Sequence, residues 1–291
     1  MPTERSEKYP GDLNIISLGA GVQSSMMALA FSRGDFKVKP GGSGKIDFAI
    51  FADTQNEGTN TYKWLDYLET QLNFPVIRVT WGNLQEDVEN YIDNGVYKRG
   101  ASIPFFLIGQ DGKKGIANRR CTSTYKIEQI EQGIRREYGL KKGQRWPKGM
   151  VVNQYLGISY DEIFRMKTFE KASYRFHYPL VEQKITRMDC FKWMQERQYP
   201  KPAKSACVYC PYHDNKFWKE MRDERPDEWK QCVDFDKKVR TAGPALGLSR
   251  AKELYIHSSR VPLDKVDLDK GSDQPDLFGD MADECEGMCG V

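Results

Sequence analysis

The nine residues SLGAGVQSS at positions 17–25 constrain the fold more than any other stretch of the chain. They follow the apolar run LNII (13–16) and precede MMALA (26–30), so they join a strand to a helix. Small residues let backbone N–H groups approach an anion closely, and the N-terminus of a helix adds a favourable dipole. The turn lacks the Gly-Lys-Ser/Thr of a Walker A loop and does not match G-x-G-x-x-G. It therefore indicates an anion-binding turn of another kind, or a tight turn that holds no ligand.

The same alternation of strand and helix continues along the chain. We expect strands near 13–18, 46–52, 75–80 and 151–157, and helices at 22–33, 59–72, 84–93, 123–138, 186–198 and 214–239. Strands that alternate with helices favour a parallel sheet with helices on both faces, so the predicted fold class is α/β and Rossmann-like.

We divide the chain into three parts. Residues 1–180 form the predicted α/β domain, and 181–261 form a smaller, mostly helical region that carries a C-x-x-C pair. Residues 262–291 are rich in Asp, Gly and Pro and show no periodicity, so they are expected to be a flexible tail that contains cysteines.

Composition excludes some classes of protein. A mean hydropathy of -0.67 and the absence of any apolar run near the roughly 20 residues of a membrane helix predict a protein with no membrane partner. The polar N-terminus has no signal-peptide core, and we expect a cytoplasmic location. The net charge is only +3, so the overall charge does not indicate nucleic-acid binding. One exception is RREYGLKKGQRWPKG (135–149), which is either a solvated helix end with a loop or a contact surface for an anionic polymer.

Seven cysteines suggest metal ligands or redox groups rather than disulfides in a reducing compartment. Cys207 and Cys210 form a C-x-x-C pair that suits half a zinc site, a redox dithiol or half an iron–sulfur site. No second close pair is visible for a zinc ribbon. Cys190 lies in the amphipathic stretch TRMDCFKWMQ, which is typical of a buried core thiol as well as of a ligand.

Further polar motifs follow the predicted strand ends, where ligands gather in open α/β sheets. In chain order they are FADTQNE (51–57), NRRCTSTYKI (118–127), GISYDEIFRMK (157–167) and CVYCPYH (207–213).

This ordered set resembles the phosphoadenosine phosphosulfate (PAPS) reductase-like family, within the adenine nucleotide alpha-hydrolase or N-type ATP pyrophosphatase superfamily. The resemblance covers roughly residues 13–230. SLGAGVQSS is similar to the family's S-x-G-G-x-D/Q-S phosphate loop, and FADTQNE is similar to F-A-D-T-G-x-E. CTSTYKI resembles C-T-x-x-Y-K, and GISYDEIFR resembles G-I-x-x-D-E-x-x-R.

The resemblance implies a HUP-type Rossmann-like sheet that binds ATP, or PAPS or adenosine phosphosulfate (APS), with Mg²⁺ as a further cofactor. Its phosphate cradle would be Ser17, Gly19, Gly21, Gln23 and Ser24. Asp53 would lie near the adenosine. The cations for phosphate or sulfate would come from Arg119, Arg120, Lys126 and Arg165. Mg²⁺ would be held, or Arg165 oriented, by Asp161 and Glu162. Position 23 is Gln where ATP-cleaving members usually carry Asp, and an amide binds a hard cation less strongly than a carboxylate does.

The resemblance also assigns the thiols. It implies a [4Fe–4S] cluster on Cys121, Cys207 and Cys210, with Cys190, a tail cysteine or a substrate sulfur as fourth ligand. APS reductases usually show adjacent cysteines where this chain has Cys121-Thr122. The tail sequence ECEGMCGV (284–291) is somewhat similar to the reductases' C-terminal segment, so Cys285 would attack sulfur and Cys289 would resolve the mixed intermediate.

Three functions follow from these expectations. The first is ATP-dependent adenylation of a nucleobase or nucleic acid, followed by sulfur transfer at an iron–sulfur cluster. The second is a PAPS or APS reductase that releases sulfite through a tail cysteine, and the third is a non-catalytic nucleotide-binding module with a structural metal. The partners implied are an adenine nucleotide, tRNA or DNA, a thioredoxin-like reductant or a cysteine desulfurase, and a second copy of the chain in a homodimer.

Overall fold

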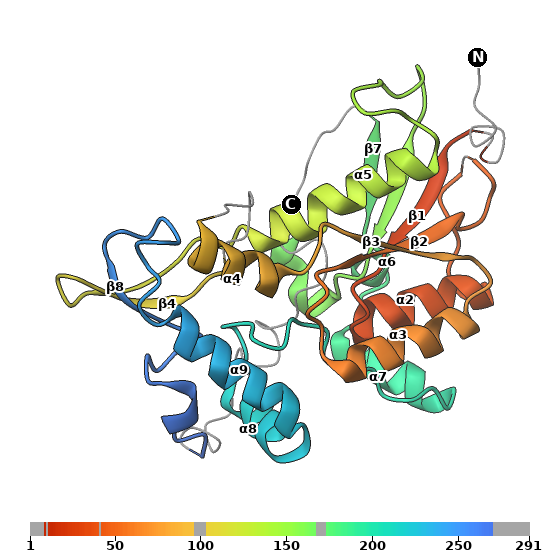
Figure 1. Ribbon diagram of the computed structural model, residues 1–291. Helices are drawn as coiled ribbons and strands as arrows, with labels where there is room; N and C mark the ends of the chain where they lie inside the picture. Colours follow the sequence, from red (N-terminus) through yellow and green to blue (C-terminus); the bar gives the residue numbers. More distant parts are fainter. Residues whose placement is uncertain (1–8, 10, 41, 96–102, 167–172, 270–291) are drawn as a thin grey trace.

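A five-stranded parallel sheet forms the centre of the computed structural model, which describes residues 9, 11–40, 42–95, 103–166 and 173–269 (Figure 1). The strand order is β3-β2-β1-β6-β7. The strands are β1 (Leu13–Ser17), β2 (Phe48–Asp53), β3 (Val76–Thr80), β6 (Val152–Leu156) and β7 (Tyr174–His177). This is the Rossmann-like order in which the chain reverses direction across the sheet beside the first strand. The predicted fold class is confirmed.

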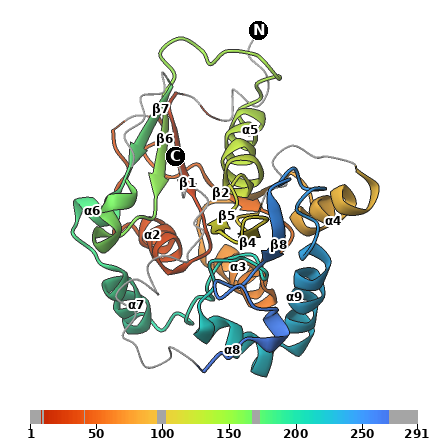
Figure 2. The same ribbon diagram turned by 90° about the vertical axis from the view of Figure 1, so that its left-hand side faces the viewer.

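Helices cover both faces of the sheet. The helix α5 (Glu128–Glu137) packs against β2 and β3 on one face. On the other face lie α2 (Val22–Arg33), α3 (Thr59–Gln71), α6 (Pro179–Glu182) and α7 (Arg187–Glu196), as Figures 1 and 2 show. Because both faces are covered, β1 and β6 are buried along their whole length, and β1 and β2 read as nearly continuous apolar runs rather than alternating ones.

A second layer packs beside the carboxyl edge of this sheet. It consists of a three-stranded antiparallel sheet in the order β5-β4-β8 together with two helices. The elements are β4 (Phe106–Gly109), β5 (Lys114–Ile116), β8 (Ala251–Tyr255), α8 (Asn215–Glu224) and α9 (Pro226–Val239). The sequence predicted one helix over 214–239, but the helix breaks at Arg225. Proline lacks an N–H and disfavours the helical conformation in the residue before it, and Arg225 has φ -134° and ψ 62°.

The remaining elements connect the layers. They are α4 (Leu84–Asn94), the π-helical turn η1 (Thr122–Ile127) that continues into α5, the 3₁₀ turn η2 (Tyr160–Arg165) and the 3₁₀ turn η3 (Leu263–Lys265). Within the described ranges, no helix combines the length and the apolar character needed to cross a membrane.

The layers do not follow the predicted boundaries. β4 and β5 lie inside the segment assigned to the first domain, yet β4 pairs with β8 from the far end of the chain. Conversely, α7 was assigned to the C-terminal region but packs on α2. Leu263 and Leu268 are buried in the second core, so the packed chain continues beyond 261. Residues 270–291, with Cys285 and Cys289, lie outside the described residues.

The first helix is pressed against the end of β6 at a single glycine. A Cβ atom on Gly157 would lie 2.6 Å from the Cα and 2.7 Å from the N of Ser24, which is closer than real Cβ atoms approach backbone. Glycine at 157 therefore allows the loops after β1 and β6 to meet.

We expect Gly157→Ala to lower the free energy of unfolding by roughly 1–3 kcal/mol, because the backbone of α2 must shift to admit the methyl group. Thermal and urea denaturation measure this. Gly58→Ala is the matched control, since its nearest neighbour would be 3.5 Å away, an ordinary contact. Equal stability of the two variants would contradict the packing described here.

Candidate functional site

The turn that follows β1 lies at the point where the strand order reverses, between β1 and β6. Ala20 adopts φ 59°, a left-handed conformation that is uncommon outside glycine and that clusters at functional sites. The N-cap of α2 is Gly21, which offers no side-chain cap, and the first turn carries no acidic residue. Ser24 Oγ accepts a bond from the N–H of Gly19 and so fixes the shape of the turn. The start of α2 is thus an uncapped helix N-terminus that favours an anion.

Two buried polar side chains at this crossing have no partner among the described residues. The side chain of Gln23 is fully buried, and neither its Oε1 nor its Nε2 makes a hydrogen bond. Ser159, in the loop after β6, is equally buried, and its Oγ is likewise unpartnered. An unsatisfied buried polar group is costly and calls for an explanation, such as a ligand. Ser17 differs, because its Oγ accepts a 2.6 Å bond from Gln154 Nε2.

The end of β2 forms the next part of the site. Asp53 accepts bonds from the N–H of Gln55 and from the hydroxyl of Tyr62, each at 2.7 Å. Burial, together with the neighbouring Asp53 carboxylate, raises the pKa of Tyr62, so the phenol remains a donor to Asp53. Gln55 has φ 59°, which places a second left-handed residue at this edge of the sheet. Asp53 is therefore held in place at the carboxyl end of its strand.

The C-x-x-C segment is docked directly onto the chain that leaves β2. Cys207 forms an antiparallel bridge with Glu57, and the N–H of Val208 donates to the carbonyl of Asn56 at 2.9 Å. The hydroxyl of Tyr209 donates to Asn56 Oδ1 at 2.6 Å. Residues more than 140 positions apart are joined in this way, so the thiol pair is fixed against the main sheet rather than carried on a free loop.

Cys121, Cys207 and Cys210 line one small cavity of about 20 Å³. Cys121 lies at the start of η1, and the C-x-x-C pair comes from the docked segment. Cys207 is buried and lies 3.1 Å from the hydroxyl of Thr54, whereas Cys121 and Cys210 are half-buried. Burial, reinforced by the charge of Glu57, raises the pKa of the Cys207 thiol well above its ordinary value. The thiol is therefore neutral at neutral pH unless a metal displaces its proton.

The three thiols that line this cavity do not form a preassembled site for a metal ion. In the part of the chain that the structure describes, no group of three or more His, Cys, Asp or Glu side chains is arranged to hold one metal ion. Three thiols are the ligands that an iron–sulfur cluster uses. The free volume is only about that of one water molecule, so a cluster requires the half-buried side chains of Cys121 and Cys210 to turn outward. His213 Nε2 donates to the carbonyl of Cys207 at 2.8 Å and supports the pair from behind.

Lys126 differs from its predicted role as an open cation. Its ammonium lies 3.1 Å from Glu57 Oε1, and the side chains are only 5% and 0% exposed. The hydroxyl of Ser205 also donates to Glu57, at 3.4 Å. The charge of Lys126 is thus compensated inside the protein at the wall of the thiol cavity.

The other predicted cations and acids are distributed around this edge. Arg119 lines the thiol cavity and lies 5.2 Å over the ring of Tyr212, whereas Arg120 is exposed. Glu162 is fully buried and pairs with Arg165.

Asp161 is engaged at the neighbouring helix. It accepts a 3.1 Å bond from the N–H of Arg187 at the start of α7. It therefore ties η2 to α7.

Two features singled out in the sequence lie away from the site. Cys190 is fully buried in the core cluster shared by α2 and α7, apart from the core that holds the other three thiols. The basic stretch 135–149 leads into the amino end of β6, at the edge of the sheet opposite the candidate site. Its aromatic residue Trp146 packs against Tyr138 and Tyr174, with ring centroids 5.2 Å and 6.1 Å away. These aromatic side chains are part of the core.

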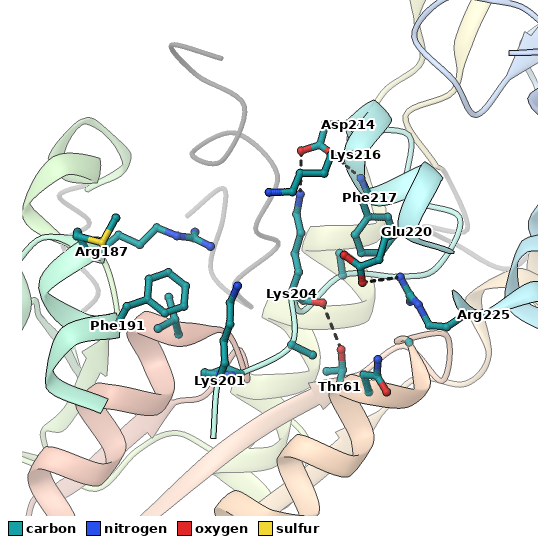
Figure 3. A pocket seen from close by; sticks show the side chains of 17 residues that line it. Thr61, Arg187, Phe191, Lys201, Lys204, Asp214, Lys216, Phe217, Glu220 and Arg225 are labelled. Atoms are coloured by element: carbon teal, nitrogen blue, oxygen red, sulfur yellow. Dashed lines mark hydrogen bonds and ion pairs between the residues drawn. The ribbon is translucent and has the colours of Figure 1, made fainter. Parts of the chain in front are cut away.

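Sequence reasoning missed a larger pocket, of about 620 Å³, between α7 and α8 (Figure 3). Its lining includes Val22, the first residue of α2, and several cations from residues 187–225. The only local sequence signal was the pair of lysines in KPAKSA (201–206), just before the C-x-x-C.

Comparison with known proteins gives a likeness of fold. No family model matches the sequence, and no curated protein matches it. Among solved structures, the chain is similar to phosphoadenylyl-sulfate (PAPS) reductase from Candida auris in its phosphate complex. The two share 12% identity with a TM-score of 0.37, over 69% of this chain and 82% of that chain. At this score the overall superposition is loose, and the function must be argued from the residues themselves.

We expect Gln23→Met to separate stability from binding. The apolar side chain has a similar length and removes two unsatisfied polar atoms, so the free energy of unfolding of the free protein is expected to stay the same or to rise by about 1 kcal/mol. Nucleotide affinity, measured by calorimetry with ATP and PAPS, is expected to fall. A variant that is destabilised by several kcal/mol, or that binds both nucleotides as well as wild type does, would show that the amide serves no ligand.

Proposed function

We propose that this chain is an adenine-nucleotide-dependent enzyme of sulfur chemistry, related to the PAPS reductase-like group. One observation carries the proposal. Cys121, Cys207 and Cys210 come from distant parts of the chain and line one cavity. One wall of this cavity is the segment that leaves β2, and β2 lies beside β1, the strand followed by the turn 17–25, which we call the anion turn. A purely structural role for the thiols would not require this position.

The nucleotide part of the proposal is supported by the crossing between β1 and β6. The uncapped N-terminus of α2, the left-handed Ala20 and the unpartnered amide of Gln23 together suit the phosphates of a nucleotide. Asp53, at the end of the neighbouring strand, would contact the ribose or the base. ATP and PAPS both present these groups.

Cys121, Cys207 and Cys210 would hold a [4Fe–4S] cluster. A cluster with three protein ligands supplies one iron to which a sulfur atom can bind. The protein's own residues shape the surroundings: the Glu57–Lys126 pair keeps the wall of the cavity neutral overall, and Thr54 Oγ1 lies 3.1 Å from Cys207 Sγ. Because the Cys207 thiol is protonated in the free chain, loading of metal would release a proton.

The leading reaction is ATP-dependent sulfur transfer. A carbonyl oxygen of a nucleobase, free or within a nucleic acid, would attack the α-phosphate of ATP and release pyrophosphate. A sulfur nucleophile would then add to the carbon that carries the adenylated oxygen, and that oxygen would leave as part of AMP. The anion turn would bind the phosphates, and Arg119 and Arg165 would stabilise the charge that develops on them.

A second candidate, the release of sulfite from PAPS or APS, is favoured by one observation. Position 23 holds a neutral amide, which binds a hard cation such as Mg²⁺ less strongly than a carboxylate does. In this reaction Cys285 would attack the sulfate sulfur and release the nucleotide. Cys289 would then attack Cys285 Sγ, which releases sulfite and leaves a disulfide for an external thiol reductant.

We expect the protein, purified without oxygen, to contain about four irons and four acid-labile sulfides per chain. Cys121→Ala is expected to lose them. Cys190→Ala is the matched control and is expected to retain them, because Cys190 lies in the other core. Stoichiometric zinc, or iron that survives in Cys121→Ala, would overturn the assignment.

The two reactions are separated by their products. We expect pyrophosphate to be released from ATP only when a nucleobase acceptor is present, and release beyond one equivalent per enzyme to need a sulfur donor as well. We expect no sulfite from PAPS or APS with a dithiol reductant. Sulfite release that is abolished by Cys285→Ser would establish the second candidate. If the protein releases neither product but binds the nucleotide tightly, the result would support a non-catalytic nucleotide-binding module.

A further inference from the structure

The pocket between α7 and α8 is a separate feature of the candidate site. Its walls are the two helices, and its floor is the segment 201–206 with the starts of α2 and α3. At about 620 Å³ it is in the size range of ligand pockets, and it is far larger than the thiol cavity. The charged side chains that line it are Arg187, Lys201, Lys204, Lys216 and Arg225, with Asp214 and Glu220. Cations thus outnumber carboxylates by five to two.

Each of two phenylalanines in the pocket supports two of these cations. The ring of Phe191 on α7 lies 5.7 Å from the guanidinium carbon of Arg187 and 5.6 Å from Lys201 Nζ. The ring of Phe217 on α8 lies 5.5 Å from Lys204 Nζ and 5.0 Å from the guanidinium carbon of Arg225. Cation–π contacts hold charged groups in place without neutralising them. Figure 3 shows the two groups on opposite sides of the pocket.

The carboxylates of the pocket balance only part of this charge. Asp214 lies 3.9 Å from Lys204, and Arg225 pairs both with Glu220 at 3.4 Å and with Glu228, outside the lining, at 2.8 Å. Among the described residues, neither Lys201 nor Lys216 has a carboxylate within ion-pairing distance. Like charges that share a pocket repel one another, and an anion between them would offset that repulsion.

Helix dipoles act in the same direction. The pocket is lined by residues of the first turns of α2, α3, α7 and α8. Carboxylates already accept N–H bonds at the starts of α3, α7 and α8, so the helix dipole favours an anion mainly at α2. Val22 is the residue next to the anion turn after β1. A ligand in the pocket therefore lies beside the proposed nucleotide.

Exposed apolar side chains, which we call the rim, occur on α7 and on the neighbouring turn η2, whose residues lie outside the pocket lining. Met188 lines the pocket and is 73% exposed, and η2 presents Phe164 at 71% and Tyr160 at 43%. η2 is tied to α7 because the N–H of Tyr160 donates to the carbonyl of Ile185 at 2.8 Å, and Asp161 accepts from the N–H at the start of α7. Exposed aromatic side chains beside a cationic groove are typical of binding to single-stranded nucleic acid, in which bases stack and phosphates pair with cations.

We propose that the α7–α8 pocket binds the phosphate backbone of a single-stranded nucleic acid, with bases stacked on the η2 rim. This inference rests on the proposed function, since it makes the acceptor of that reaction a base within a strand. A free nucleotide needs only the anion turn and one base site. The additional cations and the apolar rim suit several consecutive nucleotides.

The experiment measures fluorescence anisotropy of a labelled single-stranded RNA or DNA 12-mer with the full-length protein over a range of salt. Lys201→Ala/Lys216→Ala is expected to weaken binding about tenfold and to flatten the log–log salt slope by roughly 0.7 per lysine. Phe164→Ala is expected to weaken binding roughly fivefold or more with the salt slope unchanged, because stacking does not release counterions. The controls Lys192→Ala on α7 and Lys219→Ala on α8 remove the same charge outside the pocket lining.

Each outcome decides the matter. Equal losses in the control and pocket lysine variants, or tighter binding of the duplex than of the single strand, would overturn the proposal. The proposal would also be overturned if wild type does not bind the 12-mer and Lys201→Ala/Lys216→Ala loses ATP or PAPS binding. That result would make this the pocket of the nucleotide itself. If the 12-mer fails to bind while the nucleotide and the iron are retained, only this inference fails. If the 12-mer binds as expected and neither nucleotide nor iron is held, the proposed function fails instead.

Discussion

The candidate site depends on the attachment of the C-x-x-C segment to the chain that leaves β2. The bridge between Glu57 and Cys207 and the bonds made by Asn56 place the thiols at the edge of the main sheet. The buried pair of Glu57 and Lys126 joins the same segment to η1, which begins beside Cys121. Loss of one partner would leave an uncompensated buried charge, at a cost of about 3–5 kcal/mol. The pair therefore holds η1 against the segment that leaves β2.

This attachment also explains the chemistry available to the thiols. Cys207 is buried beside a carboxylate, and that position raises its pKa and suppresses free thiolate. A redox dithiol needs the opposite environment, with a lowered pKa and open access. The surroundings of Cys207 thus do not suit a nucleophile that acts alone, and a ligand role would require the metal to displace the thiol proton. Cys121 and Cys210, which are half-buried, are the thiols placed for contact with whatever enters the cavity.

The sequence predicted the central sheet well because its strands are buried on both faces and are separated by amphipathic helices. It missed β4, β5, β7 and β8, which are strands of only three to five residues, too short to show a clear alternation. A pairing between residues 106–109 and 251–255 leaves no local periodicity to read. The predicted division into domains differs from the observed layers for the same reason, because β4 and β5 of the second layer come from inside the segment assigned to the first domain. The open role predicted for Lys126 failed because no local pattern revealed its partner Glu57.

Charge shows the limit of sequence reading most clearly. The chain's densest run of cations, 135–149, leads to the amino end of β6, about 16 Å of strand from the site, and its aromatic residues are packed in the core. The cations of the α7–α8 pocket are scattered over 39 positions from Arg187 to Arg225, and acidic residues are interspersed among them. Folding separates the two signs: Arg225 pairs with Glu220 at the wall, while Lys201 and Lys216 line the pocket without an ion-pair partner among the described residues. A near-neutral chain thereby acquires a cationic pocket beside its anion turn, which is the electrostatic condition for two anionic substrates to meet.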